Sequence, residues 1–386
     1  MAITISGSGI TSANIADGTI TTDDINSSDV SSLKSGRKNL IINGGMNVAQ
    51  RGTSTTGVGT TGFFACDRVK FYAGAGGGSS SSRYTVTQST DAPSGFANSF
   101  KIDCTTANAS PSAAHNTFLR FGLIENQDLI RTKFGTSSAE SLTLSFWVKS
   151  NITGSQQALI VSHTNQKQAG DTFTIDSADT WEKKTITVPG DTVNSFANNS
   201  SQAITVDMFL EAGSNYYGGT AQGTTWGART DNTKAVNRLN ISSSTSNYIN
   251  FTGVQLELGS TATDFEHRSY GEELALCQRY YFDYGYAAGA DTVRFNPGAA
   301  TVASAKFQMN LQFPVGMRAA PTVTVSANGR ADGVLTTLNS NGNGRLPSSW
   351  AGAADITANY CTIFCVDDDD TVKTGFRGYF KADAEL

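Results

Sequence analysis

The sequence is short of charge. Of its 386 residues, 28 are Lys or Arg and 33 are Asp or Glu, together 16% of the chain. The basic residues are not concentrated in any segment, so the chain lacks the patch that follows nucleic-acid phosphates, and we expect no nucleic-acid partner. Since disordered chains usually replace apolar residues with charge, the low charge also argues against disorder.

Long apolar runs are also missing. The longest, such as ALIV at 158–161, fall far short of the roughly 20 residues that cross a bilayer as a helix. The N-terminus has neither the basic flank nor the long apolar core of a secretory signal. We therefore expect that the chain does not insert into a membrane. We also expect that it is made in a reducing cytoplasm, where the cysteines stay free thiols. They are Cys66, Cys104, Cys277, Cys361 and Cys365.

Catalytic and cofactor motifs are absent from the sequence. It contains no G-x-S-x-G, Walker A or H-E-x-x-H motif, and its three histidines lie in separate segments. GVGTTG at 57–62 has dinucleotide-binding spacing, but it precedes strand-like residues instead of opening a helix. The aspartates of VDDDDTV at 366–372 lack the spacing and glycine of a calcium loop and are typical of a solvated turn. We expect no enzyme activity, no cofactor and no metal.

Short alternating strands are the main pattern that is present. The chain has 39 glycines, and strand signals alternate with turn signals from residue 39 to residue 268. SLTLSFWVKS, AITVDMFLEA and GVQLELG each place apolar residues on one face, which indicates antiparallel strands of a sandwich. The residues expected on the solvent faces include Trp147, Lys149, Asp207, Phe209, Glu211, Gln255 and Glu257.

The N-terminal segment repeats every five residues, and five fits neither the helical period of 3.6 nor the strand period of 2. A single chain therefore cannot bury these apolar residues as one stripe. Parallel copies around an axis could, with about 1.5–3 kcal/mol for each buried side chain. We expect an oligomeric stalk; a flexible linker with chance spacing is the alternative. The repeat residues are Ile10, Ile15, Ile20, Ile25 and Val30.

Several stretches resemble bacteriophage tail-fibre proteins. They are NLIINGGMNVAQRGTS, LTLSFWVKSN, WEKKTITVPGDT and GVQLELGSTATDFEHRSYGEELALCQRYY, within residues 38–285. The central domain of that group resembles jelly-roll carbohydrate-binding modules. The ITTDDI repeat is similar to the virion-proximal segment of such fibres, and QFPVGMRAAPTVTVS and GYFKADAEL are similar to their terminal domain.

The resemblance implies a homotrimeric virion appendage that joins another tail or adaptor protein through its N-terminus. We expect a mainly β chain with four parts: a repeat stalk for virion attachment (1–37), an antiparallel jelly-roll sandwich (38–268), a linking helix (269–285) and a smaller C-terminal β-sandwich (286–386). The expected function is a tail fibre that binds host cell-surface polysaccharide. The alternatives are a purely structural fibre or adaptor segment and, less favoured, a polysaccharide depolymerase with hidden carboxylates.

The linking helix is expected at RSYGEELALCQRYY, where Ser269 and Glu272 form a capping box. One and a half heptads of an apolar seam follow. We expect three such helices to pack about the fibre axis; the alternative is a helix that lies across its own sandwich. The seam residues are Tyr270, Leu274, Cys277 and Tyr281.

Aromatic side chains are the candidate glycan contacts, because sugars stack on aromatic faces while neighbouring polar groups bond their hydroxyls. Trp147 is expected on an outward strand face, and other candidates lie in loops. The alternative is that they pack beneath loops or against a neighbouring subunit. Trp181 is expected in the core. The loop candidates are Tyr216, Tyr217, Trp226 and Trp350.

Overall fold

In the computed structural model the regular structure is mainly antiparallel β-sheet, which confirms the predicted mainly β class. It describes residues 37–74, 81–285, 293–295, 305–326, 336–339, 344–345, 351–367 and 373–386. The isoleucine repeat, Trp350 and Asp368 to Val372 lie outside these residues.

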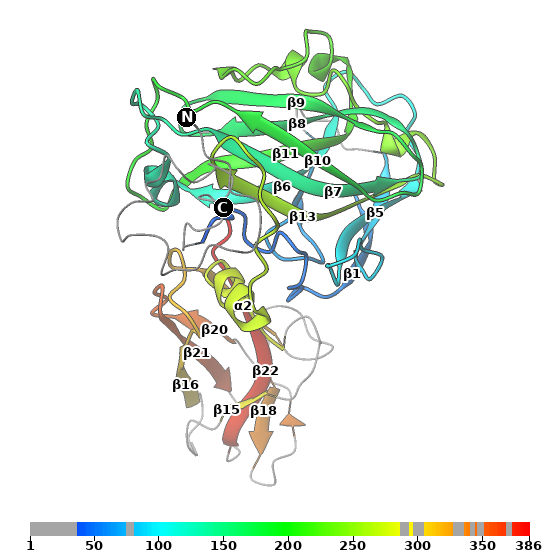
Figure 1. The fold of residues 1–386 in the computed structure, drawn as a ribbon. Coiled ribbons are helices and arrows are strands. Elements are labelled where there is room, and N and C mark those ends of the chain that lie inside the picture. The colour runs from blue at the N-terminus through cyan, green and yellow to red at the C-terminus, as the bar shows by residue number, and fades with distance from the viewer. Residues whose placement is uncertain are drawn as a thin grey trace, which may run out of the picture.

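Two sheets form a large sandwich (Figure 1). Sheet A has the order β1 (Ser54–Val58), β4 (Arg83–Ser89), β5 (Ser99–Thr106), β13 (Tyr248–Leu258), β7 (Leu142–Ser150) and β10 (Glu182–Val188). Sheet B has the order β12 (Gly227–Ala228), β9 (Lys167–Ile175), β8 (Gly154–Ser162), β11 (Gln202–Ala212), β6 (Asn116–Glu125), β3 (Lys70–Ala73) and β2 (Gly62–Phe63). From β5 to β8 each successive strand changes sheet, as in a jelly roll.

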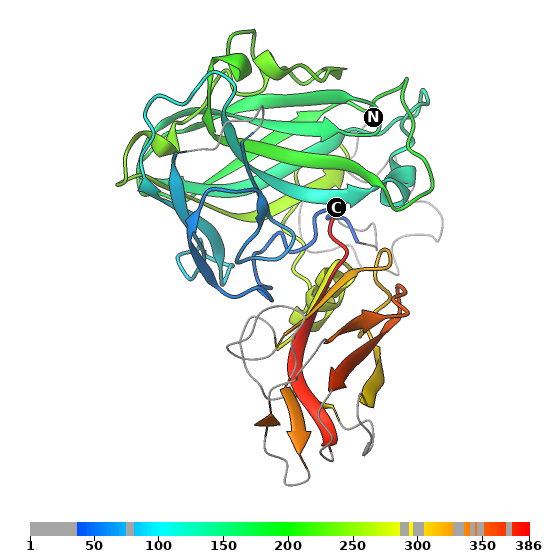
Figure 2. The same ribbon diagram turned by 180° about the vertical axis from the view of Figure 1, so that it is seen from behind.

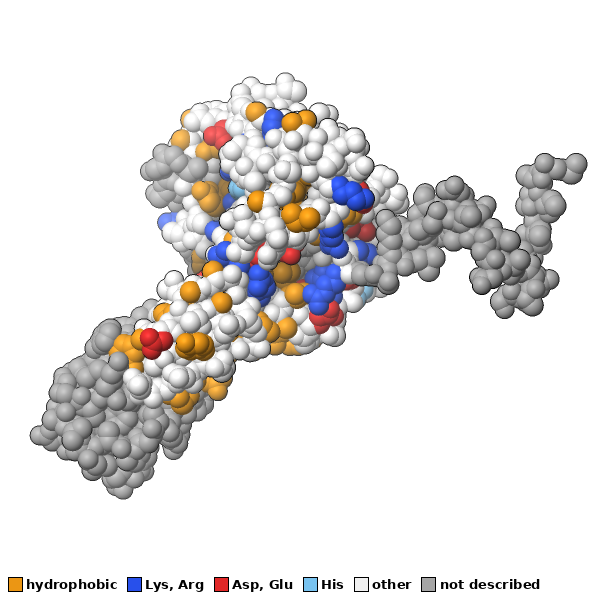
Figure 3. Space-filling model, turned by 90° about the vertical axis from the view of Figure 1, so that its left-hand side faces the viewer, with side chains coloured by type: hydrophobic (Ala, Val, Ile, Leu, Met, Phe, Trp, Pro, Cys, Tyr) orange, Lys and Arg blue, Asp and Glu red, His pale blue; other side chains and the backbone are white. Residues whose placement is uncertain are grey.

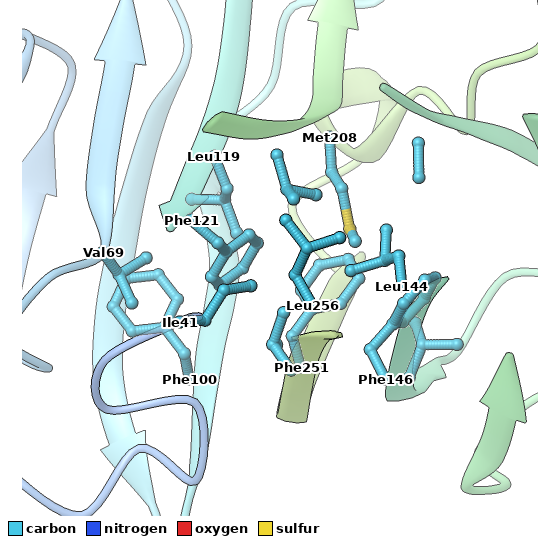
Figure 4. Packing of buried hydrophobic residues seen from close by; sticks show 14 of the residues in the cluster. Ile41, Val69, Phe100, Leu119, Phe121, Leu144, Phe146, Met208, Phe251 and Leu256 are labelled. Atoms are coloured by element: carbon cyan, nitrogen blue, oxygen red, sulfur yellow. The ribbon is translucent and has the colours of Figure 1, made fainter. Parts of the chain in front are cut away.

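The core of the large sandwich lies between the inner faces of its sheets (Figure 4). Phe146 and Leu144 of β7 face Met208 of β11, and all three are fully buried. The ring of Phe251 lies 6.2 Å from that of Phe146 and 5.7 Å from that of Phe121, in tilted and edge-on arrangements. The inward faces predicted for β7 and β11 are therefore confirmed.

The outer face of sheet B is buried, contrary to the expectation from its alternation. Asp207, Phe209 and Glu211 are at most 4% exposed. The residues after β11 fold back over this face, and Tyr216 and Ala235 join the apolar cluster that contains Phe209. The alternation along a strand predicts on which face of the sheet a side chain lies. It does not predict whether another segment of the chain covers that face. This segment contains η3 (Ser214–Tyr216), η4 (Asp231–Thr233) and η5 (Ile241–Ser243).

The outer face of sheet A is covered in part, which corrects the expected exposure of Gln255 and Glu257. Both are at most 2% exposed, because the residues after β13 turn back across the strand. Thr263 donates its backbone N–H to Glu257 Oε1 at 2.9 Å, and the Glu266 N–H donates to Gln255 Oε1 at 2.8 Å. Trp147 and Lys149, further along β7, remain partly exposed.

A short helix, α2 (Tyr270–Gln278), follows this crossing segment (Figure 1). Its N-cap is Ser269, whose hydroxyl accepts the Glu272 N–H at 3.3 Å, as predicted. The Glu272 carboxylate pairs with Arg37 at 2.6 Å. The buried residues of the helix are Glu273 and Cys277, so this face packs on its own chain.

The strands after α2 form a smaller lobe (Figure 2). The long strand β22 (Lys373–Asp383) pairs with β14 (Tyr281–Tyr284), β17 (Thr322–Ser326), β15 (Val293–Phe295) and β18 (Thr336–Asn339), which continues to β19 (Gly344–Arg345). A second sheet has the order β16 (Ala305–Gln312), β21 (Tyr360–Asp367) and β20 (Ala351–Ala354). Cys361 and Ile363 of β21 and Phe380 of β22 lie in one apolar cluster between the sheets.

The two lobes are joined by buried ion pairs. The Glu385 carboxylate, just past β22, pairs with Arg68 and lies 3.3 Å from Arg51, both in the large sandwich. Tyr280 donates its hydroxyl to Glu125 Oε1 at 2.7 Å, and Arg279 binds both oxygens of the same carboxylate. Figure 3 shows Lys and Arg side chains gathered where the lobes meet. Glu125 is the last residue of β6, before η2 (Asn126–Thr132).

Candidate functional site

A bulge in β13 opens a space on the outer face of sheet A. The pairing of β13 with β7 shifts register between Thr252 and Gln255. Gly253 lies in the bulge with φ +60°, a left-handed conformation that glycine adopts without steric cost. A Cβ at this position would lie 2.7 Å from Phe96 Cζ and 3.0 Å from Trp147 Cδ1. Glycine therefore lets both rings lie directly against the strand backbone.

Three rings gather beside this bulge. Phe96 comes from the connection between β4 and β5, while Phe265 and His267 come from the segment that crosses sheet A after β13. Their centroids lie 5.0 Å apart for Phe96 and Phe265, 5.3 Å for Phe96 and His267, and 4.9 Å for Phe265 and His267. The edge-to-face angles of Phe265 against its two neighbours are favourable for aromatic contacts. The rings thus brace one another and fix the wall of the space.

Trp147 forms the opposite part of this space, which we name the Trp147 hollow. Its volume is about 230 Å³, which is below the roughly 300–1,000 Å³ of sites that enclose drug-sized ligands and suits a single small ring. Besides the four rings and two glycines, the lining has two serine hydroxyls, the ammonium of Lys183 and the carboxylate of Asp264. The lining residues are Ser94, Gly95, Phe96, Ser145, Trp147, Lys183, Gly253, Asp264, Phe265 and His267.

A second aromatic residue lies further along the same face. Asp91 accepts a hydrogen bond from Lys149 Nζ at 2.8 Å and another from Trp181 Nε1 at 3.1 Å. Partial burial opposes ionisation of Asp91, but the hydrogen bonds from Lys149 and Trp181 outweigh it and lower the pKa of Asp91. Trp181 is partly exposed, not part of the core as the sequence suggested, because its indole N–H bonds to this surface carboxylate.

The loop candidates lie elsewhere. Tyr216 is 7% exposed and packs with the cluster over sheet B. Tyr217 lies under the Arg238 guanidinium, 3.7 Å from its ring. Trp226 donates to the Pro189 carbonyl at 2.7 Å and meets Phe134 edge-on. Among the predicted glycan contacts that the structure describes, Trp147 is the one that lines the hollow, and Trp350 lies outside the described residues.

Sequence reasoning missed the other walls of the hollow. Phe96 stands in the turn-rich stretch PSGFANS, and Phe265 and His267 stand in TDFEH. The rule that singled out Tyr216, an aromatic ring in a loop with little core to join, applies equally to Phe96. TDFEH belongs to a stretch that resembles tail fibres, but the site residues predicted from that stretch were those of the helix seam and not Phe265 or His267.

The predicted helix seam divides into two halves. Tyr270 is 60% exposed and Leu274 is partly exposed. Cys277 is fully buried within its own chain, and Tyr281 is 3% exposed beneath the Arg51 guanidinium, 3.5 Å from its ring. The first half of the seam is therefore exposed, and the second half is occupied by its own chain.

Within the described ranges, no helix combines the length and apolar character that a membrane crossing needs. The same ranges hold no cluster of three or more His, Cys, Asp or Glu side chains suited to a metal ion.

Comparisons with known proteins found similar solved structures only. No protein-family model matches the chain, and no curated protein matches it. A carbohydrate-binding module of family 4 is 13% identical over 56% of this chain and 97% of its own, with a TM-score of 0.26. The family 11 module of Clostridium thermocellum, solved with a mixed-linked tetrasaccharide, is 11% identical over 56% of this chain and 98% of its own, with a TM-score of 0.25.

A third similar structure is the tandem CBM22-1–CBM22-2 domain of Paenibacillus barcinonensis Xyn10C. It is 11% identical over 92% of this chain and 93% of its own, with a TM-score of 0.26. All three are carbohydrate-binding modules by description. Because the TM-scores are this low, these similarities carry no argument. The jelly-roll assignment is based on the strand order of the two sheets, and the choice of candidate site is based on the residues that line the Trp147 hollow.

Proposed function

We propose that the chain binds a glycan without cleaving it, and that one sugar ring stacks on Trp147 in the hollow. The observation that carries this proposal is a partly exposed tryptophan that lines a hollow together with three other rings and several polar groups. A pyranose ring presents C–H groups on its faces and hydroxyls at its edge. Stacking on Trp147 would bury the face, while Lys183 and Asp264 would bond the hydroxyls.

The lining of the hollow favours binding over hydrolysis. Glycoside cleavage generally uses two carboxyl groups, separated by about 5–9.5 Å across the scissile bond. The residues that line the hollow include a single carboxylate, that of Asp264. A depolymerase acting at this site would lack its second acid, so the proposal is a non-catalytic receptor-binding role.

We place this activity in a bacteriophage tail fibre that attaches to host-surface polysaccharide. The five-residue repeat and the tail-fibre resemblance support a homotrimer joined to another tail protein through its N-terminus. One shallow hollow gives weak binding, and three copies on one fibre would raise the avidity without any new contact. A purely structural fibre segment is the alternative, and it predicts no glycan binding.

The test is binding of the purified full-length chain to an array of bacterial surface glycans. We expect a defined set of glycans to be bound, and we expect Trp147→Ala to abolish that binding with the thermal unfolding midpoint largely kept. Trp226→Ala, which removes a tryptophan outside the hollow, should bind like the parent chain. No binding by the parent, or equal binding by the Trp147→Ala variant, would reject the proposed site. Release of reducing ends from bound polysaccharide would establish the depolymerase instead.

A further inference from the structure

The outer face of sheet A continues past the hollow in an ordered way. Trp147 of β7 pairs with Thr252 of β13 on one side and with Lys183 of β10 on the other. Trp181 stands two residues before Lys183 and therefore takes the same face of the sheet. Its hydrogen bond to Asp91, which also binds the outward-facing Lys149, confirms that side.

A third aromatic side chain extends the same face. Tyr248 begins β13, and the next residue, Ile249, is fully buried in the core, so Tyr248 points outward. Its hydroxyl donates to Asp179, and Lys101 Nζ lies 5.0 Å from its ring centroid. Tyr248 is partly exposed.

These three residues spread over three neighbouring strands, with β7 between β10 and β13. Two residues along an antiparallel strand span about 7 Å, and adjacent strands lie about 4.8 Å apart. On this geometry the Trp181 position lies roughly 8 Å from Trp147 on one side, and the Tyr248 position lies roughly 14 Å from Trp147 on the other side of β7. The three platforms therefore cover an area wider than one sugar ring.

The platforms are held in place by their polar ends. The Trp181 indole N–H is fixed by Asp91, and the Tyr248 hydroxyl is fixed by Asp179. Ordering these rings before a ligand arrives lowers the entropic cost of binding. This arrangement differs from that of Tyr216, whose ring is buried beneath a loop.

Lys149 and Lys101 on this face are already paired, and the hollow adds one charge of each sign, from Lys183 and Asp264. Lys149 pairs with Asp91 at 2.8 Å, and Lys101 pairs with Asp103 at 2.7 Å. An anionic sugar would have to compete with these carboxylates for the lysines. A neutral chain can instead bond its hydroxyls to the remaining lone pairs and N–H groups without breaking either pair.

We infer that Trp147, Trp181 and Tyr248 form one extended site for a linear, neutral glycan chain of at least three rings. This inference rests on the proposed function, because it takes the Trp147 hollow as its first subsite. The glycan would run along the outer face of sheet A. The protein would contact its internal sugar rings as well as its terminal ring.

The experiment uses an array that carries matched neutral and uronic-acid-containing linear glycans of one to eight rings, probed with the full-length chain. Affinity should rise with length up to three rings or more. Trp181→Ala and Tyr248→Ala should each weaken the binding of long neutral chains about two- to tenfold and leave single-ring binding unchanged. Trp181→Phe and Tyr248→Phe keep a ring and should retain part of the increase in affinity with glycan length. They replace the alanine variants in this test if an alanine variant does not fold.

The outcomes separate the two proposals. If Trp147→Ala loses binding but both alanine variants bind long chains like the parent, the extended site is wrong and the proposed function stands. If Trp147→Ala also binds like the parent, the proposed function fails as well. Preferred binding of the uronic-acid series, weakened by raising the salt from 50 to 500 mM, would overturn the neutral ligand class.

Discussion

The guanidinium of Arg68 lies 3.5 Å from the ring centroid of Tyr280, and this contact joins the large sandwich to the segment that leaves α2. Arg68 also pairs with Glu385, and Tyr280 bonds to Glu125. Both partners are nearly inaccessible to solvent. Buried charges that lose a partner are costly, so we expect this junction to hold the two lobes in one orientation.

Removing the Tyr280 hydroxyl tests the junction. Tyr280→Phe leaves Glu125 with Arg279 but removes a buried hydrogen bond to a carboxylate, and we predict a loss of about 1–3 kcal/mol in the free energy of unfolding. Tyr281→Phe is the matched control, because the Tyr281 hydroxyl bonds at 3.3 Å to the partly exposed Asp283. Its effect should stay within about 0.5 kcal/mol. Denaturant titration measures both, and equal effects would contradict the assigned role.

Asp67 should give the junction an unusual pH dependence. Burial raises the pKa of Asp67 to about 6, while Arg51 and Gln50 only partly offset it. The folded state therefore binds this proton more tightly than the unfolded state, whose Asp pKa is near 3.8. Proton binding by Asp67 therefore adds to the free energy of unfolding as the pH falls from above 6 to below 4. The contribution is complete below pH 4 and is lost as the pH rises through 6.

The variant Asp67→Asn isolates this effect, since it keeps an acceptor but does not titrate. We predict that the parent chain gains up to roughly 3 kcal/mol relative to Asp67→Asn between pH 7 and pH 4. Thermal unfolding midpoints across that range measure the difference. A constant difference between the two proteins would show that Asp67 titrates normally.

Gly253 should be essential to the hollow. Gly253→Ala places a methyl group against Phe96 and Trp147 in a left-handed backbone conformation, so we predict lost glycan binding and a stability loss of roughly 1–3 kcal/mol. Gly57 has a similar φ of +71° with nothing within 4 Å of the added Cβ. Gly57→Ala should therefore carry backbone strain alone and keep its binding on the array. Binding retained by Gly253→Ala would mean that the rings are not set by the bulge.

The assembly state is a separate prediction. The five-residue repeat predicts that light scattering of the full chain gives three times the chain mass of 40.7 kDa, and that removal of residues 1–36 lowers this value. Tyr270→Ala, which truncates the exposed half of the helix seam, should weaken the trimer further. A monomer at all concentrations would remove the support for a fibre.

The sequence was most informative for features that depend on one strand or one turn alone, such as the direction in which a side chain points. The alternation in SLTLSFWVKS correctly placed Phe146 inside and Trp147 outside, because the pleat alone sets those directions. The bulge at Gly253 changes the phase of β13, with Phe251 and Val254 both in the core, and a strict alternation cannot show this. The cap at Ser269 was predicted because it depends on neighbouring residues only.

The candidate site was less accessible to prediction because it is assembled from distant segments. Phe96 and Phe265 lie 5.0 Å apart, yet many strands separate them in the sequence. Their meeting depends on the pairing of β5 with β13 and on the return of the chain after β13. Likewise, Glu211 has the sequence pattern of an exposed residue but is fully buried by the segment that follows its strand.

The most direct test of glycan binding at Trp147 uses fluorine NMR. The chain has four tryptophans, so 5-fluorotryptophan labelling gives four signals, which single Trp→Phe variants assign. On titration with the best glycan from the array, we predict that the signals of Trp147 and Trp181 shift together in a saturable manner while that of Trp226 stays unchanged. A saturable titration that leaves the Trp147 signal unmoved would contradict the account.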